Sequence, residues 1–297
     1  MNIHRKRMLK SNLTGYAFIL PNIIGVVLFT LIPMLYSLFV SFTDWDYTKG
    51  FGNYNFIGIK NFIDMWSDEW FTTSLLNTIF FSVVVVPATI ILALVIAVII
   101  DRYCFAKLPI RLMMFMPYIS NVVAVAIVWV MMSAPWGPIT QLMETFGWKE
   151  PPQWLGDPTW ALPAIMLMTI WSNVGYAIMI YTSSIQGLPK DAYEAAEIDG
   201  ANALQQFRYL TINFLSPTTF FLVITTFITS FQVFAPIQIM TRGGPGSSSN
   251  VLVYYIYTSA FSFYKMGYAS AMSWILFIIL FAITMVQWHG QKKWVSY

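Results

Sequence analysis

The chain has 297 residues, of which 58% are hydrophobic and only 10% charged. Soluble domains carry roughly 25% charged residues, so this composition excludes a soluble globular protein and indicates one that lies in a lipid bilayer. The net charge of +3 and the single cysteine argue against a nucleic-acid-binding surface, an internal disulfide framework and a cysteine-cluster metal site.

Six stretches of the chain are apolar, contain no Asp, Glu, Lys or Arg, and are each longer than the roughly 20 residues that a helix needs to cross a bilayer core. These stretches are residues 11–43, 70–100, 112–143, 158–189, 209–241 and 266–291. We therefore predict an all-α integral membrane protein with a single transmembrane domain over residues 1–297. Its six transmembrane helices are expected at about residues 14–42, 73–100, 109–133, 160–184, 212–240 and 266–289.

The first stretch follows a basic run and superficially resembles a secretory signal. It is too long for the apolar part of a signal peptide, and no small-residue cleavage site follows it, so we expect it to be retained as the first span. A seventh apolar segment, residues 251–264, is too short to cross the bilayer and is predicted to be interfacial or re-entrant.

The basic residues are distributed unevenly between the loops. Most of the 16 lie in the N-terminal segment, residues 101–111, residues 190–208 and the C-terminal segment. Since cytoplasmic loops are enriched in Lys and Arg, both termini are predicted to be cytoplasmic. The six stretches leave no charged residue inside the bilayer, which argues against a carrier driven by protons or sodium.

The loop between the fourth and fifth spans, residues 187–213, contains signals for two short helices. Pro189 favours an end to the fourth span, because its ring cannot continue a helix. Two residue pairs have the spacing of a capping box, Asp191 with Glu194 and Asn202 with Gln205. Gly200 lies between the pairs and is suited to a left-handed helix stop. The loop is therefore predicted to fold as helix–glycine–helix on the cytoplasmic surface.

The same loop carries a family resemblance. Its signature is Glu194, Ala195, Ala196 and, after three further residues, Gly200. This pattern resembles the coupling loop in the permease subunits of ATP-binding-cassette importers. The family pattern continues with Ile-x-Leu-Pro, and the corresponding residues here are Leu210, Thr211, Ile212 and Asn213. Asn213 thus replaces the usual proline, while a later proline that often accompanies the motif is present at Pro217.

Further segments are similar to the carbohydrate branch of that family, namely residues 18–21, 31–33, 41–44, 56–58, 241–245, 255–257 and 267–271. The resemblance implies the type I importer permease fold, with a cytoplasmic two-helix loop that docks into a groove on an ATP-binding subunit. It also implies a bacterial cell-membrane complex that contains a second related permease, two ATP-binding subunits and an extracytoplasmic solute-binding protein. ATP and Mg would be bound by those partner subunits.

The chain itself offers no material for catalysis. It has no Gly-x-x-x-x-Gly-Lys-Ser/Thr loop, so we expect it to bind no ATP, no other cofactor and no metal, and to contain no catalytic residue. Its two histidines, His4 and His289, lie near the two ends, and no pair of acidic residues lies within a span. A membrane-embedded enzyme is therefore disfavoured.

Polar residues follow helical spacing in the two spans that flank the loop. They are Thr169, Ser172, Asn173 and Tyr176 in the fourth span, and Thr225, Thr229 and Gln232 in the fifth. Such uncharged groups suit the hydroxyls and ring faces of a sugar, and in maltose-type relatives the transport site is built from the same two spans. The alternative is that they bond helix to helix within the membrane. Helix-to-helix bonding is favoured for the threonines and Ser172. A role in the solute path is favoured for Asn173 and Gln232, because their amides are costly to bury without a partner.

Two functions of different kinds remain. The first is a permease subunit of an ATP-driven importer that moves a sugar or oligosaccharide from an extracytoplasmic binding protein into the cytoplasm. The second is a carrier or channel that acts alone on a neutral polar solute, which leaves the 187–213 loop unexplained. The solute itself stays open, because oligosaccharides, monosaccharide derivatives and glycerol phosphate all occur among such relatives.

Overall fold

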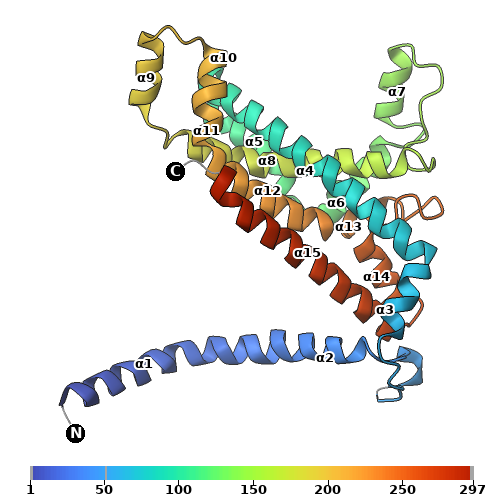
Figure 1. The fold of residues 1–297 in the computed structure, drawn as a ribbon. Helices are drawn as coiled ribbons and strands as arrows, with labels where there is room; N and C mark the ends of the chain where they lie inside the picture. Colours follow the sequence, from blue (N-terminus) through green and yellow to red (C-terminus); the bar gives the residue numbers. More distant parts are fainter. Residues whose placement is uncertain (1–2, 51, 295–297) are drawn as a thin grey trace. The chain divides into compact units, whose positions relative to one another are not determined.

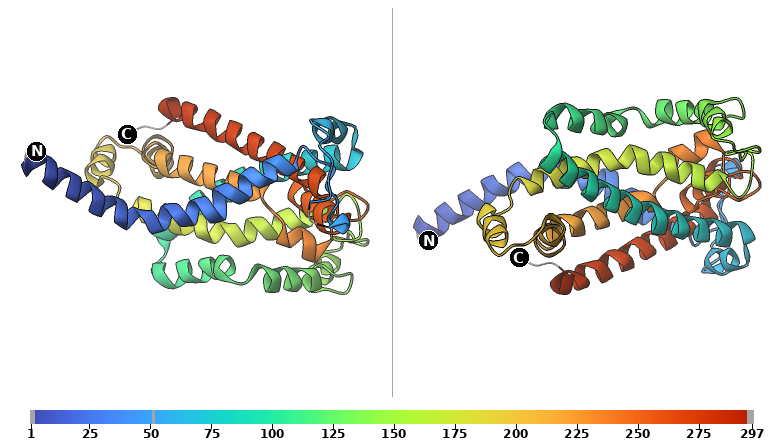
Figure 2. Two further views of the ribbon diagram at one scale, coloured as in Figure 1. Left: turned by 90° about the horizontal axis from the view of Figure 1, so that it is seen from below. Right: turned by 90° about the horizontal axis from the view of Figure 1, so that it is seen from above.

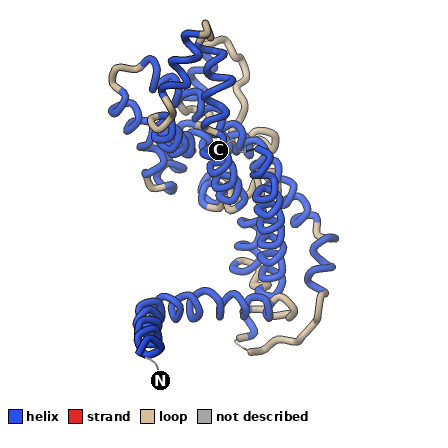
Figure 3. Tube along the Cα trace, turned by 60° about the vertical axis from the view of Figure 1, so that its left-hand side comes forward, coloured by secondary structure: helices blue, strands red, loops and turns tan. Residues whose placement is uncertain are grey.

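The computed structural model describes residues 3–50 and 52–294, and within these ranges every regular element is a helix (Figure 3). Side chains are described for residues 15–50 and 52–290, so those of the N-terminal basic run, His4 included, lie outside the described part. The chain divides into two compact units, which we describe separately. One contains the residues up to Met65 together with Ile256–Ile275, and the other contains Trp66–Tyr255 together with the residues from Leu276 onward.

The first unit begins with a long apolar helical run. It consists of α1 (Ile3–Val26), the π-helix η1 (Val27–Leu31) and α2 (Ile32–Val40). Pro33 lies in the first turn of α2, directly after the π-helix. A proline ring clashes with the carbonyl one turn earlier, and a local π turn is one way in which membrane helices accommodate it. The first predicted span therefore continues through Pro33, as it does through Pro21 within α1.

A compact loop follows α2 in the same unit. It contains η2 (Tyr47–Lys49) and α3 (Lys60–Asp64), while η3 (Met65–Ser67) leads out of it. The buried Asn61 amide donates to the carbonyls of Ser41 and Thr43, at 2.9 and 2.8 Å. Asp44 accepts hydrogen bonds from the backbone N–H (2.6 Å) and side-chain amide (3.0 Å) of Asn55, which hold the pKa of this exposed carboxyl below its usual value.

The second unit contains most of the helices. In chain order they are α4 (Glu69–Tyr103), α5 (Lys107–Ile119), α6 (Val122–Met132), α7 (Pro138–Thr145), α8 (Ala161–Ile185), α9 (Lys190–Ile198), α10 (Ala203–Gln206), η4 (Phe207–Thr211), α11 (Ile212–Phe214), α12 (Ser216–Phe231) and α13 (Ala235–Met240). Two more, α14 (Leu252–Phe261) and α15 (Met266–Trp294), have residues in both units. Helix α8 packs against α4 and α5, α4 packs against α12, and α13 packs against α6 (Figure 2).

Small residues allow the closest of these approaches. Ala93 and Ala97 of α4 are fully buried, in a cluster with Ile178 and Tyr181 of α8 and Leu222 of α12. Where α8 meets α5, a Cβ added to Gly175 would lie 1.9 Å from the backbone oxygen of Met114. Close backbone contact through small residues is typical of helices that associate within a membrane.

The apolar helices overlap the predicted spans, but two of them are bent, and the fifth covers residues 203–231 where the sequence predicted 212–240. Four helical runs are long and apolar enough to cross a membrane, namely Gly15–Val40, Glu69–Tyr103, Ala161–Ile185 and Met266–Gly290. The third and fifth predicted spans are instead bent pairs, Lys107–Ile119 with Val122–Met132 at 94° and Ala203–Phe214 with Ser216–Phe231 at 65°. Helix α14 has only 10 residues, too few to cross. The count of six spans holds if each bent pair forms one span, and it remains a prediction.

Candidate functional site

The 187–213 loop begins where α8 ends. Helix α8 stops at Ile185, and α9 starts at Lys190 directly after Pro189, whose backbone is extended (φ −68°, ψ 112°). The capping box predicted for Asp191 and Glu194 is wrong, because Asp191 already lies within the first turn of α9 and no side chain caps this helix. The Asp191 carboxylate stands instead at the positive end of the helix dipole, where a negative charge is favourable.

Gly200 ends α9 as predicted. Its φ of +81° is in the left-handed region, which favours glycine. The Gly200 N–H donates to the Glu197 carbonyl at 3.0 Å, and the Ala201 N–H donates to the Ala196 carbonyl at 2.8 Å. These two bonds form a Schellman motif, which satisfies the last carbonyls of α9 and turns the chain sharply.

The second short helix starts with the predicted capping box. The Asn202 side-chain oxygen accepts from the Gln205 N–H at 2.9 Å, and the Gln205 side-chain oxygen accepts from the Asn202 N–H at 2.8 Å. The segment therefore folds as helix–glycine–helix. Figure 1 shows α9 and α7 at opposite ends of α8.

The return from this loop into α12 does not need the missing proline. Asn213, which replaces it, donates its side-chain amide to the Tyr209 carbonyl at 2.7 Å. The bend of 65° lies at Leu215, and Pro217 occupies the first turn of α12 after it. A proline is compatible with that position because the first N–H groups of a helix have no partner within the helix.

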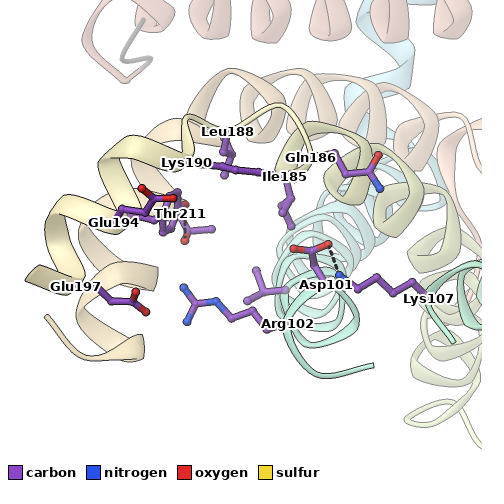
Figure 4. Close-up of a pocket in the computed structure, with 12 residues that line it drawn as sticks. Asp101, Arg102, Lys107, Ile185, Gln186, Leu188, Lys190, Glu194, Glu197 and Thr211 are labelled. Atoms are coloured by element: carbon purple, nitrogen blue, oxygen red, sulfur yellow. Dashed lines mark hydrogen bonds and ion pairs between the residues drawn. The ribbon is translucent and has the colours of Figure 1, made fainter. Parts of the chain in front are cut away.

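A pocket of about 540 Å³ that is lined by charged and apolar residues lies between α9 and the ends of α4 and α8 (Figure 4). Its charged lining residues are Asp101, Arg102, Lys107, Lys190, Glu194 and Glu197. Asp101 is paired with Lys107 at 3.2 Å and with Arg111 at 3.6 Å. Arg102 instead reaches α10, where its Nη2 donates to the side-chain oxygen of Gln206 at 2.9 Å. Neither Arg102 nor Gln206 was singled out from the sequence, because their contact joins residues about a hundred positions apart.

The loop presents an exposed surface that is partly apolar. Glu194, Ala195 and Gly200 are exposed and Ala196 is half-buried. Two large apolar side chains stand out from the same loop, Ile198 at 87% exposure and Leu204 at 74%. Ile198 lies at the end of α9, which the Schellman motif closes, and Leu204 lies in α10, whose start is closed by the capping box, so the exposed surface is carried on an ordered turn.

The predicted solute-path residues are only partly brought together. Thr169, Ser172, Asn173 and Thr229 line one pocket of about 180 Å³ between α8 and α12. The remaining three do not line it. Tyr176 stacks on Tyr118 of α5, with ring centroids 4.8 Å apart, while Thr225 donates to its own helix and the exposed Gln232 follows the last residue of α12.

Several of these hydroxyls already have partners within their own helices. Thr169 donates to the Ile165 carbonyl at 2.8 Å, and Thr229 donates to the Thr225 and Thr226 carbonyls at 3.1 and 3.0 Å. Each hydroxyl oxygen can still accept a hydrogen bond from a solute. Within residues 3–50 and 52–294, no three His, Cys, Asp or Glu side chains are placed to hold a metal ion.

These observations define a class of protein, an α-helical membrane protein with an ordered helix–glycine–helix loop between α8 and α12. The chain belongs to the family of binding-protein-dependent transport system inner membrane components, whose model matches residues 89–293. It is therefore an integral protein of the inner membrane and a transport subunit that works with a separate binding protein.

Full-length relatives support this family assignment. The chain is 36% identical to the probable ABC transporter permease protein YesP of Bacillus subtilis, over 97% of this chain and 93% of that protein. It is 32% identical to the lactose transport system permease protein LacF of Rhizobium radiobacter, over 95% of each. A chain of a bacterial ABC transporter involved in the import of alginate shares the fold, with a TM-score of 0.85 at 20% identity over 99% of this chain and 100% of that one.

Proposed function

We propose that this chain is one of two related permease subunits in an ATP-driven importer that moves a sugar or oligosaccharide into the cytoplasm. The 187–213 loop is its coupling loop, which docks onto an ATP-binding subunit. Both termini and this loop face the cytoplasm, in agreement with the excess of Lys and Arg on that side. The observation that carries the proposal is the exposed apolar pair Ile198 and Leu204 on an ordered loop between α8 and α12.

The solute class rests on two kinds of support. A lactose permease is among the relatives that match nearly the whole chain. The pocket between α8 and α12 is lined by uncharged hydroxyl and amide groups, which suit a neutral polyhydroxylated solute. A carrier that acts alone would need no apolar docking surface on the loop, so we do not favour it.

Docking is tested by placing a charge on the proposed surface. Ile198→Asp should reduce the ATP-binding subunit that co-purifies with the permease pair by roughly tenfold or more, because an apolar side chain buried at a contact contributes about 1.5–3 kcal/mol. The matched control is Phe146→Asp, which alters another exposed apolar residue, at 88% exposure, just after α7 at the other end of α8. Undiminished co-purification by an Ile198→Asp, Leu204→Asp double variant would overturn the docking role.

The solute is tested separately. The cognate binding protein should be stabilised thermally by one or more members of a panel of neutral oligosaccharides and monosaccharides. Proteoliposomes that contain the full complex should then accumulate that radiolabelled sugar in an ATP-dependent manner. Stabilisation by amino acids or inorganic anions alone would contradict the sugar assignment and leave the coupling loop unaffected.

A further inference from the structure

The cytoplasmic end of α4 is held rigidly by its neighbours almost to its last residue. Ala97 and Ile100 are buried at 0% and 2% exposure, in the cluster formed with α8 and α12. Arg102 follows two residues later, in the last turn of the helix. A displacement of Arg102 is therefore transmitted to a long, well-packed helix, although α4 is not adjacent to the coupling loop in the sequence.

Gln206 is the residue that Arg102 meets on the loop, and it is bonded on several sides. It is only 7% exposed, and its side-chain amide also donates to the Ala201 carbonyl at 3.3 Å, directly after the Gly200 turn. Its own carbonyl accepts from the Thr211 hydroxyl at 3.4 Å, and that hydroxyl lies 3.0 Å from the hydroxyl of Tyr193 on α9. Gln206 thus joins α9, α10 and η4 into one hydrogen-bonded unit, to which Arg102 is attached.

The neighbouring charges leave Arg102 available for this contact. The adjacent carboxylate, Asp101, is occupied by Lys107 and Arg111 on the α5 side. Figure 4 shows the Arg102 guanidinium pointing away from that pair, across the pocket toward Glu197 on α9. A hydrogen bond donated by a charged group is stronger than one between neutral groups. The guanidinium of Arg102 is also planar, so its N–H groups donate in fixed directions.

We propose that Arg102 is a positioning residue for energy coupling: it ties α4 to the coupling loop through Gln206, so that movement of the loop on the ATP-binding subunit also moves α4. This inference rests on the proposed function. It adds a third connection to the loop, beyond its covalent links to α8 and α12. Arg102 does not line the pocket between α8 and α12, so its proposed role is to transmit motion and not to bind the solute.

The single cysteine provides the readout, because Cys104 directly follows α4 and lies two residues after Arg102. The assembled complex, with cysteine-free partner subunits, is labelled at Cys104 with an environment-sensitive fluorophore and mixed with MgATP. The wild-type complex should show an ATP-dependent fluorescence change. Arg102→Met should lower its amplitude about threefold or more, as expected for loss of one charge-assisted hydrogen bond at a partly exposed site. The amount of ATP-binding subunit that co-purifies should not change.

Matched variants separate coupling from simple disruption. Lys107→Met removes another cation that lines the same pocket and that pairs with Asp101, so it should preserve the signal. Gln206→Met should lower the signal like Arg102→Met, and the double variant should be no worse than either single one, because both remove the same contact. Gln206→Glu should retain the signal by accepting from the same guanidinium.

The outcomes distinguish this inference from the proposed function. A full ATP signal in the Arg102→Met complex, with the ATP-binding subunit still docked, would refute the role of Arg102 and leave the coupling loop intact. Additive losses in the Arg102→Met, Gln206→Met double variant would also refute it. Absence of any ATP signal at Cys104 in the wild-type complex would refute the movement of α4 and with it this inference. Retention of the ATP-binding subunit after the Ile198 and Leu204 changes would instead count against the proposed function itself.

Discussion

Replacing Gly175 with alanine is the most direct test of how α5 and α8 pack. The added Cβ would lie 1.9 Å from the Met114 oxygen and 3.0 Å from the Phe115 Cα. Ordinary contact begins near 3.4 Å, so the two helix backbones would have to separate by about 1.5 Å. No side-chain rotation can relieve this clash, because the closest atoms all belong to the backbone of α5.

The expected cost lies at the upper end of the range for overpacked cores, about 3 kcal/mol. For a unit of this size that corresponds to a lower unfolding midpoint by roughly 6–12 °C. A thiol-reactive dye that reports exposure of the half-buried Cys104 can follow the transition in detergent or nanodiscs. The shift should be accompanied by a change around Tyr176, whose ring stacks on Tyr118 just beyond the widened contact.

Gly290→Ala is the control, since an added Cβ at this helical position meets nothing within 4 Å. It should leave the midpoint unchanged or raise it slightly, because alanine favours helix more than glycine does. A midpoint for Gly175→Ala equal to that of the wild type would refute the close approach of α5 and α8.

Three further predictions follow from the proposed orientation, the solute path and the loop after α2. A membrane-impermeant thiol reagent should label Cys104 only after the cells are permeabilised, and labelling of intact cells would reverse the orientation. The Asn173→Leu variant should assemble normally but accumulate roughly five- to a hundredfold less labelled solute, since a lost polar contact costs about 1–3 kcal/mol; normal uptake would remove Asn173 from the path. The pKa of Asp44 lies below its usual value of 3.8, so its hydrogen bonds from Asn55 should persist at pH 3.8 and be lost only as the pH falls through the lowered pKa. Amide exchange at Asn55 can follow this loss. Loss of protection already above pH 5 would contradict the assignment.

The 187–213 loop shows where the sequence is sufficient. The left-handed stop at Gly200 and the capping box of Asn202 and Gln205 depend on groups within a few residues of one another, and the structure confirms both. The predicted box at Asp191 and Glu194 fails for an equally local reason. The same spacing occurs inside a helix that starts one residue earlier, at Lys190, so spacing alone could not fix the boundary.

The solute-path residues show where periodicity ends. Helical spacing groups Thr169, Ser172 and Asn173 on one side of α8, and the structure places Thr229 beside them. The same helical spacing predicted that Gln232 lies on one face of a helix with Thr225 and Thr229, but α12 ends at Phe231, before Gln232. The end of a helix changes the direction of every later side chain. The charge-free stretch 209–241 contains no sequence signal that predicts the end of α12.

Long-range contacts lie beyond a reading of the sequence alone. The Asn77 amide lies within 3.1 Å of the carbonyls of Ser247, Ser248 and Asn250, about 170 residues later in the chain. The Arg102–Gln206 hydrogen bond likewise joins residues that are 104 positions apart in the chain. Each depends on how α4 packs against the rest of its unit, and the residues involved look like ordinary polar positions in the sequence.

The two bent pairs have a consequence for how the chain enters the membrane during synthesis. Four of its helical runs are sufficiently long and apolar to partition into lipid by themselves, whereas each bent pair is interrupted by a sharp bend between two shorter helices. A translocating segment with such a break is better accommodated beside helices that have already been inserted. The pair α5–α6 follows α4 in the chain, and the pair that ends in α12 follows α8, so in both cases an intact apolar helix precedes the broken one. The order of helices along the chain therefore favours co-translational insertion, in which each long helix prepares a protein surface for the bent pair made after it.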